Sequence, residues 1–342
     1  MPPATAAAMG KTHTVRFEPV GIEMEADEDE TILNAAFRQG IMLMHGCKEG
    51  QCSACKSFLL DGEVDLDRYS TFALPDFEEA EGWTLLCRAH PYSDMEIELI
   101  NYDEEIIHGG TPPRTVSTVV ESVESLTSDI FGLKLKPDEP IEFKPGQYVD
   151  ITIPGTDHHR SFSMANTNPD TLEFMIKHYE GGKFSGLLKS GSIKPGDAID
   201  VTGPYGVFTL RPSSPRRLLF IGGGAGMAPI LSLLRHMQDT GSAREAAYYY
   251  GARTEADLFQ LDELGTLPCG FVPALSEDSN GWNGESGLIT DVVERLEGDV
   301  TEVDAYVCGP PPMVEATIAL LERKGVPEAH IYYDKFTTTA DE

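Results

Sequence analysis

The sequence predicts a multidomain protein in which an α+β segment and an all-β segment precede a parallel α/β segment. Three observations carry this prediction. The chain has 342 residues, of which 41% are apolar, and this is too long for one ordinary core. Two joints rich in Gly and Pro, at 107–115 and 212–215, divide it. After the second joint, strand-like runs alternate with helix-like runs, which is typical of a parallel sheet.

The first segment, residues 12–104, combines strand and helix patterns. Apolar residues alternate with polar ones at 95–100, and runs at 14–17 and 22–25 also predict strands. Residues 31–39 have a helical pattern, with Asp29 or Thr31 as the N-cap and Gly40 at the end. Residues 1–11 are expected to form a flexible tail, and residues 105–113 a linker.

The remaining two segments differ in their periodicity. In residues 114–212, runs at 146–153, 172–178 and 198–201 are separated by Pro-Gly turns, which predicts a small antiparallel barrel. In residues 213–342, strands are expected at 217–221, 246–251 and 304–308, and helices at 229–238 and 312–324. This alternation predicts a parallel α/β domain.

The formal net charge of −30 excludes several classes of partner. Nucleic acids and anionic membranes are disfavoured because both are bound through clustered Lys and Arg. No apolar run is long enough to span a membrane, and the first ten residues do not resemble a signal peptide, so we expect a cytoplasmic protein. Residues 1–105 carry 22 acidic and 7 basic side chains. This charge acts either as a solubility device or in steering a basic protein partner.

Four cysteines have the spacing C-x4-C-x2-C followed by a distant fourth cysteine, and these are Cys47, Cys52, Cys55 and Cys87. This is the spacing of plant-type [2Fe–2S] ferredoxins, in which soft thiolates hold iron. A four-cysteine zinc site is the main alternative, although such sites usually use two close pairs. Unrelated buried cysteines are the other alternative. Structural disulfides are not expected in a reducing cytosol.

The residues around these cysteines carry a family resemblance. The stretch HGCKEGQCSACKSFLLDGEVD, with WTLLCRAHP downstream, resembles plant-type ferredoxins, and more closely the ferredoxin domains of oxygenase reductases. The resemblance implies a β-grasp domain that holds a [2Fe–2S] cluster. Cys269 and Cys308 lie outside this stretch and are not expected to be ligands.

Two motifs in the second segment resemble the FAD site of the ferredoxin–NADP⁺ reductase superfamily. The first is the R-x-[Y/F]-S signature, formed here by Arg160, Ser161, Phe162 and Ser163. The second is a G-x-x-S turn, formed by Gly182, Lys183, Phe184 and Ser185. The resemblance implies that Arg160 contacts the FAD pyrophosphate, that Phe162 packs on the isoalloxazine and that Ser163 lies near flavin N5. An antiparallel FAD-binding barrel is therefore expected.

A glycine-rich loop, GGGAGMAP at 222–229, opens the third segment after a predicted strand. Its spacing does not fit G-x-G-x-x-G, so the usual dinucleotide fingerprint fails. The loop resembles the GG-x-G-x-x-P nucleotide loop of the same superfamily, and a structural glycine turn is the alternative. The resemblance implies nucleotide contacts from Gly223, Gly224, Gly226, Met227 and Pro229.

Further motifs of the third segment concern the nicotinamide and the choice of nucleotide. Cys308, Gly309 and Pro310 resemble the CGP motif at the nicotinamide, and residues 332–336 resemble the superfamily's terminal Y-x-x-x-F element. The resemblance implies that Phe336 shields the flavin. Ser163, Cys308 and Phe336 are thus the expected catalytic residues. After the second strand, Arg253 is the one basic residue and Glu255 follows it, which favours NADH over NADPH.

The resemblance covers nearly the whole chain and implies one pathway for electrons. It points to the reductase component of bacterial soluble di-iron monooxygenases of the propane, alkane or phenol type. NADH, FAD and a [2Fe–2S] cluster would pass electrons to a hydroxylase component, and the reductase alone is expected to be a monomer. A ring-hydroxylating dioxygenase reductase is the alternative within the class. A non-catalytic metal- and nucleotide-binding regulatory subunit is the alternative outside it.

Overall fold

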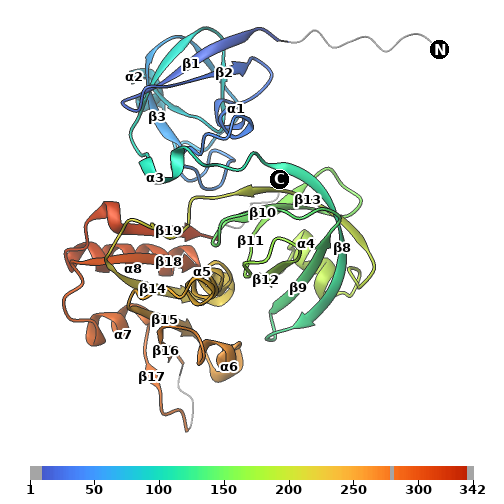
Figure 1. Cartoon of the computed structure of the whole chain (residues 1–342), viewed down its shortest axis with the longest axis vertical. Helices are drawn as coiled ribbons and strands as arrows, with labels where there is room; N and C mark the ends of the chain where they lie inside the picture. Colours follow the sequence, from blue (N-terminus) through green and yellow to red (C-terminus); the bar gives the residue numbers. More distant parts are fainter. Residues whose placement is uncertain (1–9, 278–280, 337–342) are drawn as a thin grey trace. The chain divides into compact units, whose positions relative to one another are not determined.

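The structure, a computed structural model, describes residues 10–277 and 281–336, so most of the expected tail lies outside the described residues. The chain divides into two compact units, Met1–Pro113 and Arg114–Glu342 (Figure 1). In the described part, no helix combines the length and the apolar character needed to cross a membrane.

The first unit is built on a mixed five-stranded sheet with the order β2-β1-β7-β3-β5. The strands are β1 (Thr12–Glu18), β2 (Ile22–Asp27), β3 (Lys56–Asp61), β5 (Trp83–Leu85) and β7 (Met95–Leu99). Helix α1 (Ile32–Arg38) buries Ile32 and Leu33. The Thr31 hydroxyl accepts the Asn34 N–H at 3.3 Å, so Thr31 and not Asp29 is the N-cap.

Shorter elements complete this unit. Strands β4 (Val64–Leu66) and β6 (Ala89–Pro91) pair antiparallel, and α2 (Asp76–Glu81) precedes β5. Residues 104–107, next to the Gly-Gly joint, form a short helix, α3 (Glu104–Ile107). Its Ile106 and Ile107 are buried, and Met42 donates its N–H to the Ile107 carbonyl at 3.0 Å. The unit thus holds this segment by apolar packing and a backbone hydrogen bond.

The second unit begins with a six-stranded antiparallel barrel of order β11-β10-β13-β8-β9-β12. Its elements are β8 (Arg114–Ser125), β9 (Ile130–Pro137), β10 (Tyr148–Thr152), β11 (His159–Ser163), β12 (Leu172–Lys177), α4 (Lys183–Lys189) and β13 (Ala198–Tyr205). A bridge between Met164 and Phe174 brings the β11 and β12 edges together, so the barrel is nearly closed. The predicted barrel is confirmed.

The unit continues with a parallel sheet of order β17-β16-β15-β14-β18-β19. Its strands are β14 (Arg217–Gly223), β15 (Ala246–Ala252), β16 (Gly270–Leu275), β17 (Glu285–Ser286), β18 (Val303–Gly309) and β19 (Ile331–Lys335). The helices are α5 (Met227–Thr240), α6 (Leu261–Leu264), α7 (Ile289–Leu296) and α8 (Pro311–Arg323), with 3₁₀ turns η1 (Gly224–Gly226), η2 (Glu255–Asp257) and η3 (Glu328–His330). The predicted parallel α/β domain is confirmed.

Successive residues of β14 serve two separate cores. Leu218 and Phe220 pack with α5 and α6, whereas Leu219 and Ile221 pack with α7 and α8. Because side chains alternate across a strand, a sheet covered on both faces needs apolar residues at every position, which explains the continuous apolar run at 218–221.

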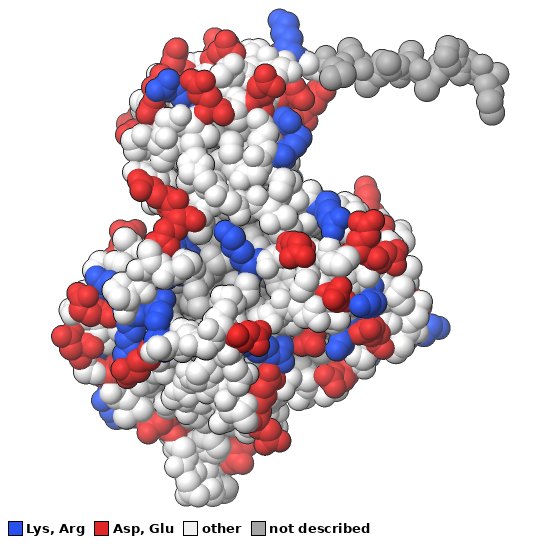
Figure 2. All heavy atoms as spheres, in the orientation of Figure 1, with Lys and Arg blue, Asp and Glu red and all other residues white. Residues whose placement is uncertain are grey.

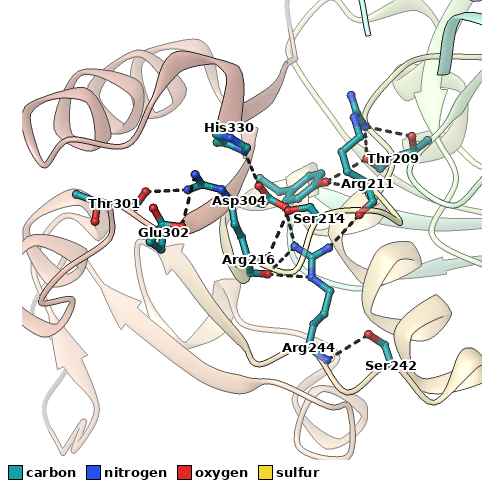
Figure 3. Close-up of polar contacts among 11 residues, drawn as sticks. Thr209, Arg211, Ser214, Arg216, Ser242, Arg244, Thr301, Glu302, Asp304 and His330 are labelled. Carbon is teal, nitrogen blue, oxygen red and sulfur yellow. Dashed lines mark hydrogen bonds and ion pairs between the residues drawn. The ribbon is translucent and has the colours of Figure 1, made fainter. Parts of the chain in front are cut away.

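A buried carboxylate fastens the amino ends of the central strands (Figure 3). Asp304 of β18 is fully buried, and its oxygens contact Arg244 at 2.6 Å and His330 at 2.8 Å. Arg244 also donates to the Arg216 carbonyl at 2.6 Å. The charge of Asp304 is therefore matched by a cation, as a buried charge requires.

Helix α5 joins the barrel to the sheet. The Ser232 hydroxyl accepts the Gly146 N–H at 3.3 Å and donates to the Asn166 carbonyl at 2.7 Å. One turn later, Arg235 donates to the Ala165 carbonyl and to Glu173, at 2.9 and 2.8 Å. These bonds fix the barrel strands β11 and β12 relative to the carboxyl edge of the sheet, where the predicted catalytic residues lie.

Candidate functional site

The four predicted cluster cysteines lie in two pairs. The Cys47 and Cys52 thiols are hydrogen-bonded to each other, and so are the Cys55 and Cys87 thiols. Among residues 10–277 and 281–336, no three His, Cys, Asp or Glu side chains are placed to hold one metal ion. Two separated thiol pairs suit two metal ions with two ligands each better than one tetrahedral zinc. All six cysteines are free thiols.

Backbone amides converge on the sulfur of Cys47. The Glu49 and Gln51 N–H groups donate to it at 3.4 and 3.2 Å. The hydrogen bond with Cys52, helped by these amides, outweighs the effect of burial and lowers the pKa of Cys47 to about 6. Lys48 and Ser53 both have a positive φ of 59°, which turns the loop so that its amides point inward. The loop fits an anionic iron–sulfur group.

The two predicted flavin motifs meet through their aromatic residues. Phe162 of β11 lies 5.2 Å from Phe184 of α4, measured between ring centroids. Ser161 donates to Asp150 of the neighbouring strand at 2.6 Å, which fixes the motif strand in the barrel. Arg160 donates to the His159 carbonyl at 2.8 Å. Residues 159–163 form strand β11, which follows β10 in the chain and pairs with it.

Helix α4 begins at Gly182, and a side chain there would not fit. A Cβ on Gly182 would come within 2.5 Å of the Ser185 hydroxyl and 3.0 Å of the Tyr179 carbonyl. In the described structure this helix has no side-chain cap hydrogen bond, and the first-turn amides of a helix can donate to an acceptor such as a phosphate. Lys183 adds a positive charge in the first turn. This donor set fits the FAD pyrophosphate.

The glycine-rich loop passes close to the carboxyl ends of the strands. Gly224 has a φ of +57°, and a Cβ on Gly223 would lie 2.9 Å from the sulfur of Met313. A Cβ on Gly226 would clash with the Cys308 carbonyl. Met227 and Pro229 lie in the first turn of α5. The bare backbone lets a helix N-terminus approach the sheet edge, which is the usual place of a nucleotide pyrophosphate.

The three predicted catalytic residues lie near one another, and one of them carries a buried thiol. Cys308 at the end of β18 is fully buried, and it pairs in register with Gly222 on one side and Asp334 on the other. Ser163 of the barrel donates to Asp334 at 3.4 Å. The Phe336 N–H donates to the Gly309 carbonyl at 3.2 Å, and Pro310 precedes α8. Ser163, Cys308 and Phe336 are thus brought together around Asp334.

Asp334 is a residue that the sequence analysis missed. Burial raises the pKa of its carboxyl to about 6, and the Ser163 hydroxyl opposes this rise. Burial also raises the pKa of the Cys308 thiol well above its usual value, so this thiol stays protonated. The sequence offered one sign of this role, because Asp334 lies two positions before Phe336 within the Y-x-x-x-F element.

Arg253, at the nucleotide end of β15, is already engaged by carboxylates. It lies 3.4 Å from Asp257 and 4.0 Å from Asp129, which comes from the turn between β8 and β9 of the barrel. Burial would raise the pKa of Asp129, but the hydrogen bond and charge of Lys177 outweigh it and lower this pKa. Asp257 also accepts from Thr254 in a capping box, so it is fixed in place. Glu255 adds further negative charge to this short turn.

Three family models match consecutive parts of the chain. They describe a 2Fe-2S iron-sulfur cluster binding domain at 15–92, an oxidoreductase FAD-binding domain at 117–210 and an oxidoreductase NAD-binding domain at 220–318. Together they define an iron–sulfur flavoprotein oxidoreductase. The cofactor expectations are confirmed: the chain binds a [2Fe–2S] cluster, FAD and NAD. The zinc alternative is excluded by the first of these domains.

Similar proteins are known over the full length. The chain is 54% identical to the propane 2-monooxygenase reductase component of Mycolicibacterium smegmatis, over 96% of this chain and 99% of that protein. It is 36% identical to the phenol 2-monooxygenase reductase component of Pseudomonas sp., over 96% of both chains. The crystal structure of an Amycolatopsis cytochrome P450 reductase superimposes with a TM-score of 0.86 at 30% identity, covering 96% of this chain and 100% of that one.

The chain belongs to the family of reductase components of multicomponent monooxygenases. It is an electron-transfer reductase whose acceptor is another protein. The predicted function is confirmed at this level, and membership of a family of reductases speaks against the non-catalytic regulatory subunit.

Proposed function

We propose that this chain delivers electrons from NADH to the hydroxylase component of a di-iron monooxygenase that oxidises propane or a related small alkane. The observation that carries the proposal is that sequence identity is highest with the propane-type reductase components and lower with the other types. Propane 2-monooxygenase reductase components are 53–55% identical to the chain, the phenol 2-monooxygenase component is 36% identical, and a toluate 1,2-dioxygenase component is 32% identical. The protein surface that contacts the electron acceptor determines which acceptor is used, and this surface differs between the reductases of different oxygenase systems.

The residue roles are part of the proposal, and the geometry of the site supports them. The two thiol pairs, Cys47 with Cys52 and Cys55 with Cys87, would each hold one iron. Arg160 and the first turn of α4 would bind the FAD pyrophosphate, while Phe162 and Phe336 would cover the isoalloxazine. When bound, the cofactors supply hydride acceptance and one-electron storage. Ser163, held by its hydrogen bond to Asp334, would lie near the flavin atom that accepts hydride.

The nucleotide preference rests on Arg253. A 2′-phosphate needs cations that are free to neutralise it, but this guanidinium already lies beside Asp129 and Asp257. A second anion would meet net repulsion there, whereas a ribose hydroxyl would not. We therefore propose NADH as the physiological donor, and Asp129 as a contributor to that choice from the barrel.

Reconstitution tests the function directly. The purified holoprotein is combined in turn with hydroxylase systems of the propane, phenol and ring-hydroxylating dioxygenase types, and substrate oxidation is measured with NADH or NADPH. We expect at least about tenfold faster turnover with the propane-type system, and a kcat/KM that favours NADH. If turnover with the dioxygenase system is equal or faster, the chain is instead a dioxygenase reductase and the proposed function is wrong.

Three further points belong to the same proposal. The functional domains run from 12 to 104, from 114 to 212 and from 213 to the end. The reductase is a monomer when separated from its hydroxylase. It works in the cytoplasm, as its family, its acidic composition and its free thiols favour.

A further inference from the structure

An exposed aromatic side chain stands beside the iron–sulfur loop. Phe72 is 96% exposed, although its neighbours Ala73 and Leu74 are buried. Phe77, five residues later on α2, is 65% exposed. A phenyl ring exposed to water leaves unused the favourable free energy that burial of its apolar surface would contribute. Single exposed apolar residues are ordinary, so the case depends on where these two lie.

The segment that carries Phe72 is bonded to the cluster loop on both sides of it. Before Phe72, the Ser70 N–H donates to the Gly50 carbonyl at 3.0 Å. After it, the Ala73 carbonyl accepts the Ser53 hydroxyl at 2.9 Å. Gly50 and Ser53 flank Cys52, the exposed member of the four cysteines. The ring thus projects from a segment fixed directly against the most accessible side of the cluster loop.

The surroundings of the two rings are acidic. Phe77 lies between Asp76 and Glu78 on a helix that also carries Glu79 and Glu81. Some of these charges have partners: Lys56 contacts Glu78 at 2.5 Å, and the Tyr69 hydroxyl donates to Glu79 at 2.6 Å. Asp76, Glu79 and Glu81 nevertheless stay exposed to solvent. Figure 2 shows such acidic side chains spread over the visible surface.

We propose that Phe72, supported by Phe77, is the apolar anchor through which the hydroxylase component docks over the cluster loop. The inference rests on the proposed function and adds the contact surface to it. The matching site on the hydroxylase is an apolar pocket with a rim of Lys and Arg. Aromatic anchors of this kind dominate binding energy when the partner desolvates them.

Charge favours the hydroxylase over two other partners for this surface, namely the chain's own second unit and a second copy of the first unit. Residues 114–342 of this chain hold 34 acidic and 19 basic side chains, and a second copy of residues 1–105 holds 22 acidic and 7 basic. Either surface would bring further net negative charge to an acidic rim. A basic partner would instead gain from the attraction, both in association rate and in orientation.

The test compares Phe72→Ala and Phe77→Ala with Tyr92→Ala, using the holoprotein and the propane-type hydroxylase. Tyr92 is also an exposed aromatic residue of this unit, at 55%, but its N–H bonds to Glu63, away from the cluster loop. We expect the Kd of Phe72→Ala to rise about 10- to 100-fold, with a smaller rise for Phe77→Ala and less than about threefold for Tyr92→Ala. Phe72→Trp should restore binding.

Two controls separate the possible failures. NADH-driven reduction of the cluster within the isolated variant, followed by stopped-flow absorbance, should match the wild type. If this step slows in proportion, the ring contacts the chain's own flavoprotein unit and the proposal is overturned. It is also overturned if Phe72→Ala binds the hydroxylase as tightly as the wild type does. A wild-type chain that does not bind the hydroxylase would instead refute the proposed function, and this inference with it.

Discussion

Replacing Asp334 by Asn should stabilise the protein at neutral pH. Asp334 has Ser163 as its hydrogen-bond partner, and burial raises the pKa of its carboxyl from its ordinary value of 3.8 to about 6. The ionised form is therefore the unfavourable one in the folded state. Asn keeps the shape and the capacity to accept from Ser163 but cannot ionise.

The magnitude follows from the shift. Each pKa unit corresponds to about 1.4 kcal/mol, so a shift of about two units sets a limit of about 3 kcal/mol. Although the environment of the carboxyl is buried, Asp334 as a residue keeps some solvent exposure, and solvent screening reduces this limit to about 1–2 kcal/mol. Between about pH 4 and 6 the folded state binds more protons than the unfolded state, so stability falls as pH rises. The cost is complete above about pH 6 and absent below about pH 4.

Equilibrium urea unfolding of the holoprotein, followed by flavin fluorescence, measures the effect. At pH 7.5, Asp334→Asn should unfold at a higher urea concentration than the wild type, and at pH 4.5 the difference should shrink to a small fraction. An equal difference at both pH values, or a less stable variant at pH 7.5, would show that the carboxylate is not destabilising and would refute the reasoning.

Three other changes test separate parts of the structure. Cys52→Ala should abolish the [2Fe–2S] absorbance and the reduction of a protein acceptor. NADH-to-dye turnover should persist, because the flavin lies in the other unit. Normal reduction of the hydroxylase by this variant would contradict the ligand assignment. Arg160→Ala should weaken FAD binding by about one to two decades, since a charged hydrogen bond contributes about 1.5–3 kcal/mol, and fluorescence titration of released flavin measures this. Asp304→Asn should lower the free energy of unfolding in urea by about 3 kcal/mol, opposite in sign to Asp334→Asn, because it leaves Arg244 without its buried partner.

Local patterns predicted the elements well because they depend on neighbours in the sequence. The strand-like runs at 14–17 and 22–25 lie within β1 and β2, and the strand expected at 217–221, with its apolar run at 218–221, lies within β14. The helix expected at 229–238 lies within α5, which starts two residues earlier, in the glycine-rich loop itself. Cysteine spacing predicted the cluster domain because three ligands sit on one short loop.

Long-range partners could not be predicted in the same way. Ser163 and Asp334 are 171 positions apart, and only the junction of barrel and sheet brings them together. The parallel register that puts Asp334 beside Cys308 is equally invisible in one sequence. The partners of surface acids are likewise invisible in the sequence: Asp67 lies 3.4 Å from Arg88 and 3.2 Å from His90, so the exposed acids of α2 are better candidates for a steering charge.

The division of one chain into two compact units has a kinetic consequence. Since both cofactor-binding units share a single covalent backbone, the step between them is unimolecular, and its rate does not change when the protein is diluted. A tether of a few residues corresponds to a local concentration in the millimolar range. Delivery to the hydroxylase, by contrast, is a bimolecular encounter that slows in proportion to dilution. At low protein concentration, electrons would therefore stay on the cluster of this reductase until it encounters a hydroxylase molecule.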